Sequence, residues 1–158
     1  MTLDAKMDFL LKTPILWISG HKALKFTDEE KAKLKEYVEK GGTILGEDCC
    51  SQKPFDDSFR ALLKELWPDS ELTVLPKDHA IYTNFAKLTQ QPKLMGLELE
   101  KGQGRMGVIY IPNGFSCKWE VGGTGVRPWM DVGNNIYLYV DRAWKRTKAK
   151  ERQLEIKN

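Results

Sequence analysis

The chain has 158 residues, of which 41% are hydrophobic and 30% are charged, and its formal net charge is +3. This length and balance are typical of one globular domain with a sizeable core. They argue against a membrane span, because the longest apolar runs, PILWI and VIYI, are only as long as strands. The N-terminal stretch MTLDAKMDFLLK lacks the basic start and long apolar stretch of a signal peptide. We therefore expect either a cytoplasmic chain or a piece of a longer parent.

The positive charge is concentrated at the C-terminus. Residues 142–158 carry seven lysines and arginines against two glutamates, so the rest of the chain is roughly neutral. A basic helical tail can bind nucleic acid or anionic lipid, but here no aromatic residues alternate with the basic ones. We therefore predict a single domain over residues 1–146 and a solvated basic tail over residues 147–158, and we expect no nucleic-acid partner.

The first third of the chain alternates strand and helix signals. Residues 14–19, PILWIS, form a continuous apolar run that predicts a strand buried on both faces. A helix follows, because Thr27 and Glu30 have the spacing of a capping box and Gly41 supplies the left-handed residue that ends a helix. Residues 43–47, TILGE, predict a second strand.

The same alternation continues through the middle of the chain. Residues 56–67 place Leu62, Leu63 and their apolar neighbours at helical spacing, which predicts a second helix with one core-facing side. Residues 71–75, ELTVL, predict a third strand. Residues 77–85 predict a loop with a short helical turn.

The second half of the chain is less regular. Residues 94–100 and 105–111 flank the glycine-rich segment KGQG, which predicts a hairpin. Residues 114–121 predict a further short strand, and residues 134–146 predict the last helix. The order strand–helix–strand–helix–strand indicates an α/β fold, with a mostly parallel sheet and a late antiparallel hairpin.

Polar residues follow every predicted strand at the carboxyl end, which is where ligands bind in an open parallel sheet. Both histidines and all three cysteines are among them. The candidate binding residues are Gly20, His21, Asp48, Cys50, Asn113 and Cys117, and Cys49 and His79 are further chemical candidates. We predict in particular that His21 and Cys117 lie close to residues 48–50.

A cysteine nucleophile is one hypothesis for this edge of the sheet. Cys49 or Cys50 would supply the thiol. His21 or His79 would serve as its base, and Asp48 would orient that base. Against this hypothesis, the two acids that precede the cysteines raise the pKa of a neighbouring thiol unless the fold turns them away.

Three other interpretations of the cysteines stay open. Cysteine and histidine are zinc ligands, but the chain has no C-x-x-C pair, so we predict neither a metal site nor a cofactor. A disulfide from Cys117 to Cys49 or Cys50 would suit an exported parent. The simplest interpretation is that the cysteines are small buried packing residues.

Four segments together resemble one family. They are PILWISGHKALKFTDEEKAKLKEYVEKGGTILGEDCC, FDDSFRALLKELWPDSELTVLPKDHAIY, VIYIPNGFSCKWE and NNIYLYV, which lie between about residues 13 and 141. They resemble an uncharacterised bacterial domain-of-unknown-function family grouped with class I glutamine amidotransferase-like α/β domains. The resemblance implies a flavodoxin-like, three-layer fold. It also implies an upstream strand–helix unit in many members and parents that are often secreted or envelope-associated.

The sequence departs from working glutamine amidotransferases in two places. Their nucleophile sits in a Gly-x-Cys-x-Gly elbow, whereas this chain has GEDCCSQ, and their late His-x-Glu pair is missing because no histidine follows His79. We therefore predict a non-catalytic binding or interaction module that uses the cleft at the strand ends for an unknown protein or small-molecule ligand. The alternative is a cysteine-dependent hydrolase or amidotransferase-like enzyme.

Overall fold

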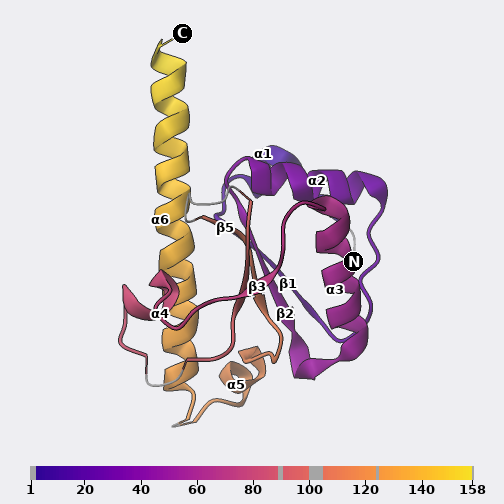
Figure 1. Ribbon diagram of the computed structural model, residues 1–158, viewed down its shortest axis with the longest axis vertical. Coiled ribbons are helices and arrows are strands. Elements are labelled where there is room, and N and C mark those ends of the chain that lie inside the picture. The colour runs from indigo at the N-terminus through magenta and orange to yellow at the C-terminus, as the bar shows by residue number, and fades with distance from the viewer. Residues whose placement is uncertain (1–2, 89–90, 100–104, 124, 158) are drawn as a thin grey trace.

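The computed structural model describes residues 3–88, 91–99, 105–123 and 125–157. These residues form three layers, with a central sheet between two groups of helices (Figure 1). The strands are β1 (Ile15–Gly20), β2 (Thr43–Asp48), β3 (Thr73–Val74), β4 (Met95–Glu98) and β5 (Met106–Ile111). The helices are α1 (Met7–Leu10), α2 (Asp28–Glu39), α3 (Lys53–Leu66), α4 (Ala80–Thr83), α5 (Ser116–Val121) and α6 (Arg127–Lys157), with a 3-10 turn η1 (Cys49–Ser51).

The described strands form a mixed sheet in the order β1-β2-β5-β4-β3. Its centre is parallel, because β2 pairs in parallel with β1 on one side and with β5 on the other. The predicted hairpin is confirmed, since β4 and β5 are antiparallel partners. The α/β fold with a parallel centre is therefore as predicted. The third predicted strand, however, is not in the parallel core: β3 has two residues and pairs with β4 in antiparallel fashion at the edge.

Two hydrophobic cores hold the layers together. On one face of the sheet, α1, α2 and α3 cover a core that includes Tyr37, Phe59 and Leu63. On the other face, α4 and α6 cover a core that includes Ile109 and Ile136. Leu62 and Leu63 are both buried, as the apolar spacing of that helix predicts. The centre of the sheet is thus enclosed on both faces, and the polar residues lie at the ends of its strands.

The ends of α2 follow the sequence signals. The Thr27 hydroxyl accepts a hydrogen bond from the backbone N–H of Glu30, and the Glu30 carboxylate accepts one from the N–H of Thr27, so the capping box is complete. Gly41 has a φ of 102°, which permits the turn into β2. Helix α3 begins at Lys53, earlier than predicted, because Pro54 suits the first turn of a helix and Phe55 extends the buried face.

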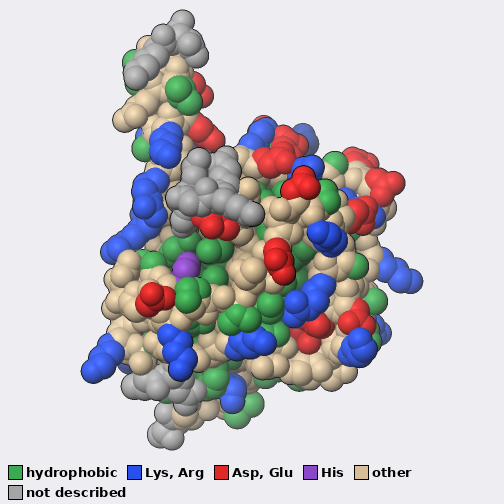
Figure 2. All heavy atoms as spheres, in the orientation of Figure 1, with side chains coloured by type: hydrophobic (Ala, Val, Ile, Leu, Met, Phe, Trp, Pro, Cys, Tyr) green, Lys and Arg blue, Asp and Glu red, His purple; other side chains and the backbone are tan. Residues whose placement is uncertain are grey.

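Two predictions for the second half of the chain were wrong. Residues 114–121 do not form a strand, because Ser116–Val121 is the helix α5. The last helix begins at Arg127 rather than residue 134 and continues to Lys157. Its C-terminal half projects from the body of the molecule (Figures 1 and 2). None of the helices in the described part of the chain combines the length and apolar character that a membrane span requires.

Strand β1 is an edge strand with one incompletely covered face. Trp17 on this strand is 43% exposed, so the prediction of a strand buried on both faces was wrong at this position. The open face lines an apolar groove of about 280 Å³ between β1, α5 and α6, with Trp119, Met130 and Tyr137 among its walls. Helix α6 covers the centre of the sheet and leaves this margin open.

Candidate functional site

The three cysteine thiols meet at the carboxyl edge of the sheet. Cys49 and Cys50 lie in η1, directly after β2, and Cys117 lies in α5, which follows β5. The Sγ of Cys49 is 3.1 Å from that of Cys117, and the Sγ of Cys50 is 3.7 Å from each of the other two. All three thiols are free. Parallel pairing of β2 with β5 brings the ends of both strands, and with them these thiols, to one place.

A histidine joins the thiols from the neighbouring strand. The register of the β1–β2 pair sets Gly20 opposite Asp48, so His21 emerges beside η1. A ring nitrogen of His21 and the sulfur atoms of Cys49 and Cys50 all lie within 4.8 Å of one another. The imidazole and the Cys50 side chain are both exposed, so a ligand can reach the cluster from solvent.

The backbone of η1 adopts an unusual conformation that directs the thiols. Cys50 has a φ of 61° and Ser51 a φ of 54°, both in the left-handed region that residues other than glycine rarely occupy. Each such residue costs on the order of 1–3 kcal/mol, and the conformation persists only where the surroundings fix it. Here the Asp48 carboxylate accepts a hydrogen bond of 2.6 Å from the backbone N–H of Gln52, which holds both ends of the turn.

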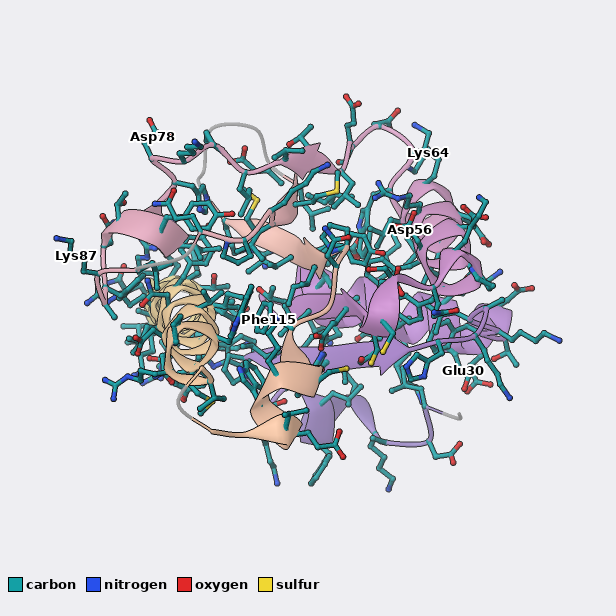
Figure 3. The ribbon with its side chains drawn as sticks, turned by 90° about the horizontal axis from the view of Figure 1, so that it is seen from below. Glu30, Asp56, Lys64, Asp78, Lys87 and Phe115 are labelled. Carbon is teal, nitrogen blue, oxygen red and sulfur yellow. The ribbon has the colours of Figure 1, made fainter. Side chains whose placement is uncertain are left out.

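Two contacts join the η1 segment to the start of α5. The buried carboxylate of Glu47 accepts hydrogen bonds of 2.8 Å from the backbone N–H groups of Phe115 and Ser116. The backbone N–H of Gly114 donates to the carbonyl oxygen of Asp48 at 2.9 Å. Figure 3 looks onto this edge, and Phe115 lies near its centre, between α5 and the sheet. These contacts fix Cys117 relative to the cysteines of η1.

The environment of this cluster raises the pKa of two of its groups, the Cys49 thiol and the Asp48 carboxyl. The hydrogen bond to Cys117, together with burial and the neighbouring Cys50, raises the pKa of the Cys49 thiol to about 12. Burial also raises the pKa of the Asp48 carboxyl, and the negative charge of Asp56 adds to this effect. The N–H of Gln52 and the positive charge of His21 act in the opposite direction on Asp48. Cys49 is therefore a protonated thiol at neutral pH in the absence of a positively charged ligand.

Most of the candidate residues do lie together. The expected proximity of His21, residues 48–50 and Cys117 is confirmed. Asn113 also belongs to this edge, because its side-chain oxygen accepts a hydrogen bond of 3.4 Å from the Ser51 hydroxyl. Gly20 lies at the end of β1, against the ring of Phe55.

His79 is elsewhere, and the expectation that both histidines share one edge was wrong. Its ring lies 5.3 Å from that of Tyr139, whose hydroxyl accepts a hydrogen bond from the N–H of Met106 at the opposite, amino end of β5. The Nδ1 of His79 accepts a hydrogen bond from Ile81 and caps α4. In Figure 3, the neighbouring Asp78 lies at the periphery, far from Phe115. The short β3 leads into a segment that packs against α6 rather than into the strand-end cluster.

Two residues that organise the site were not found from the sequence. Glu47 appeared only as an anion beside the cysteines, although its carboxylate holds the first amides of α5. Gly114 appeared only as the first residue of the predicted strand 114–121, although an added Cβ would lie 2.6 Å from the carbonyl oxygen of Asp48. The one available signal for Glu47 was its position in an apolar strand, because a buried acid needs a partner.

Comparison with known proteins gives the family of the chain and no activity. No curated protein matches the sequence. A family model described as a domain of unknown function, DUF4159, matches residues 1–149. Because that match covers nearly the whole chain, the protein belongs to the DUF4159 family of domains of unknown function.

Proposed function

We propose that this domain is a non-catalytic binding module whose ligand site is the thiol cluster at the strand ends. The observation that carries the proposal is that the three sulfur atoms face one another at 3.1–3.7 Å. A nucleophilic thiol needs a free approach and a lowered pKa. A set of thiols that converge on one point instead suits a ligand that several of them hold at once. The binding residues are Gly20, His21, Asp48, Cys50, Asn113 and Cys117, with Cys49 as a further donor.

The start of α3 also argues for binding rather than acyl transfer. An acyl-transfer enzyme offers free N–H groups to the oxyanion that develops beside its nucleophile. Here the N–H of Gln52 already donates to the Asp48 carboxylate at 2.6 Å, and the second residue of α3 is Pro54, which has no N–H. A carboxylate next to the reaction centre would repel a developing oxyanion. The raised pKa of Cys49 acts in the same direction.

We also propose that the domain shares its architecture with class I glutamine amidotransferase-like, flavodoxin-like domains of bacterial proteins. The three-layer arrangement and the parallel pairing of β1, β2 and β5 support this grouping. The resemblance of residues 13–141 to that group supports a longer secreted or envelope-associated parent. In such a parent the module would present its strand-end site to a protein or small-molecule partner, and residues 1–146 would form the domain proper.

One observation favours a second candidate, a cysteine-dependent hydrolase. Cys50 combines a φ of 61° with a position between β2 and α3, and a strained strand-to-helix turn is where hydrolases of the α/β class place their nucleophile. His21 is near enough to serve as a base. Cys50 would then be the nucleophile, with Cys49 and Cys117 as neighbours.

Alkylation kinetics separate the two functions. The metal-free, reduced chain is treated with iodoacetamide across a pH series, and the modified cysteine is identified by mass spectrometry. A binding module predicts that all three thiols react slowly below about pH 8, with Cys49 the slowest. Rapid alkylation of Cys50 at neutral pH, lost in His21→Asn and retained in the control His79→Asn, would overturn the proposal in favour of the hydrolase.

A further inference from the structure

We infer that the thiol cluster is a zinc site in which Cys49, Cys50, Cys117 and His21 bind one Zn²⁺ ion. The inference rests on the proposed function and names the ligand of that module. It revises the expectation of no metal site, which followed from the spacing of the cysteines along the chain. The fold, rather than a local C-x-x-C motif, brings the donor atoms together.

The donor set is chemically suited to zinc. Three cysteine sulfurs and one imidazole nitrogen form a common set for structural zinc sites, which have four protein ligands in a tetrahedral arrangement. Soft thiolates exclude Mg²⁺ and Ca²⁺, which require oxygen ligands. A disulfide between Cys49 and Cys117 would leave Cys50 unpaired beside it, whereas a metal ion uses all three sulfurs. A site filled by four side chains has no open position for substrate, which agrees with a non-catalytic module.

The spacing of the sulfur atoms also fits a tetrahedral ion. Zinc–sulfur bonds of about 2.3 Å at tetrahedral angles place the sulfur atoms about 3.8 Å apart. Two of the three separations in the cluster are 3.7 Å, and the third, between Cys49 and Cys117, is 3.1 Å. That pair needs to open by less than one ångström. The ring nitrogen of His21 already lies within 4.8 Å of the sulfur atoms of Cys49 and Cys50, and this exposed side chain can rotate closer to the cluster.

The segments that carry the donors are held in place without the ion. The Glu47 carboxylate and the backbone contact between Gly114 and Asp48 lock the start of α5 to η1. The left-handed backbone at Cys50 directs that side chain back toward Cys117. A site held this way loses little conformational freedom on binding, and such preorganisation strengthens affinity.

The acidic residues next to the cysteines favour a cation. Glu47 and Asp48 are buried at the end of β2, so their charges are poorly screened. These charges disfavour a free thiolate, which is why they argue against a nucleophile, but they attract a divalent ion. Asp48 also interacts electrostatically with His21. Carboxylates beside a ligating histidine commonly orient its ring in metal sites.

Metal titration of the full chain tests this assignment. The reduced, metal-free protein is titrated with Zn²⁺ against a chromophoric chelator, and separately with Co²⁺ as a spectroscopic probe. We expect one ion per chain, a dissociation constant for zinc tighter than about 1 µM, and a cobalt spectrum with thiolate charge-transfer bands and the intense visible bands of a tetrahedral site. X-ray absorption at the zinc edge should show predominantly sulfur ligands. This measurement uses the unmodified protein, so it does not depend on whether a variant folds.

Single substitutions identify the ligands. Cys49→Ser, Cys50→Ser, Cys117→Ser and His21→Asn should each weaken zinc binding, the cysteine variants by more than the roughly 10–100-fold cost of losing an outer-shell group. Each cysteine variant should also weaken the charge-transfer bands of cobalt. His79→Asn is the matched control, because it removes the other imidazole of the chain from a position outside the cluster, and it should bind zinc normally. Circular dichroism confirms that each variant is folded.

Three results would overturn the zinc assignment. The first is a zinc affinity that is unchanged in Cys50→Ser and Cys117→Ser. The second is an X-ray absorption spectrum at the zinc edge that shows mainly oxygen and nitrogen ligands, and the third is a site that binds Cu⁺ but binds Zn²⁺ more weakly than about 1 µM. In each case, slow alkylation of the metal-free thiols would still support a non-catalytic binding module, but one whose ligand is not zinc. Rapid, His21-dependent alkylation of the metal-free chain would instead overturn the module itself, whether or not zinc binds.

Discussion

Gly114 and Asp48 touch through their backbones, and this contact joins the two segments that carry the cysteines. The N–H of Gly114 donates to the Asp48 carbonyl at 2.9 Å, and the approach is so close that a Cβ at position 114 would lie 2.6 Å from the same oxygen. Only glycine therefore fits here without movement of one segment. The contact is a structural requirement of the site, although neither residue supplies a sulfur.

The first prediction follows from this contact. Gly114→Ala should push the start of α5 away from η1, lower the free energy of unfolding by about 1–3 kcal/mol and weaken cobalt binding. Chemical denaturation and cobalt titration measure the two effects. Gly125→Ala is the control, because an added Cβ at that position meets nothing within 4 Å. Unchanged cobalt binding in Gly114→Ala would show that the two segments are not rigidly coupled.

The second prediction concerns the buried carboxylate of Glu47. It accepts two hydrogen bonds from the first amides of α5, and hydrogen bonds to charged groups are the strong ones in proteins. Glu47→Ala should therefore lower the free energy of unfolding by roughly 2–4 kcal/mol, as measured by denaturation. Glu47→Gln, which keeps an acceptor oxygen, should cost less. Equal losses in the two variants would mean that the negative charge of the carboxylate, and not its acceptor oxygen or its packing, accounts for the effect.

The third prediction tests the packing of α3 against the sheet. Leu63 is 2% exposed and lies in the core under α3, so Leu63→Ala should lower the free energy of unfolding by roughly 2–5 kcal/mol. Leu154→Ala provides the comparison, because Leu154 is 63% exposed on the projecting part of α6 and its loss should cost less than about 0.5 kcal/mol. A negligible change in the free energy of unfolding in Leu63→Ala would mean that α3 does not pack against the core.

The fourth prediction concerns pH. Burial lowers the pKa of His79 below its ordinary value of about 6.5, and the negative charges of Asp78 and Glu98 oppose this only in part. As pH falls below 6.5, the unfolded chain therefore takes up this proton before the folded protein does. The free energy of unfolding should decline from that pH downwards until the folded pKa is passed.

Histidine titration by NMR and denaturation across this pH range check the prediction. The variant His79→Asn, which keeps a residue suited to cap α4, should flatten the decline, whereas His21→Asn should leave the contribution of His79 in place. A folded pKa for His79 above 6.5 would contradict the burial described for its ring.

The fifth prediction locates the end of the folded body within α6. Thr147 packs against Gly41, where an added Cβ would lie 2.9 Å from its methyl group, and the Lys148 ammonium donates to the carbonyl of Lys40 at 3.3 Å. Removing residues 149–158 should leave the melting temperature nearly unchanged, because Ile156 in that segment is 85% exposed. Removing residues 147–158 should lower it measurably. Equal losses would indicate that the terminal turns dock on the body.

The parts of the fold that could be predicted are those with local causes. The capping box at Thr27 and the left-handed Gly41 specify α2 within a few residues, and apolar runs specify β1 and β2. Helix α5 could not be predicted, because the carboxylate that holds its first amides belongs to Glu47, far away in the sequence. The exposure of Trp17 could not be predicted either, because an apolar run does not show whether its strand lies at an edge of the sheet.

The candidate site shows the same division. Parallel pairing of neighbouring strands predicts that His21 and Cys117 meet the residues after β2, and the structure bears this out. The same rule failed for His79, because β3 is an edge strand of two residues and the segment after it packs on α6. Strand-end reasoning therefore holds for the six-residue strands that pair in parallel, β1, β2 and β5, and fails for the two-residue β3.

The placement of β5 between β2 and β4 has a consequence for folding kinetics. The unit β1–α2–β2 is contiguous in the chain and can form early, but the other edge of β2 stays open until its partner strand arrives, since Ile44 pairs with Val108. Contacts between such distant residues raise the contact order and slow folding, because a long loop must close first. We therefore expect the cysteines of η1 to meet Cys117 late in folding. A thiol-specific probe added during refolding would then report when β5 pairs with β2.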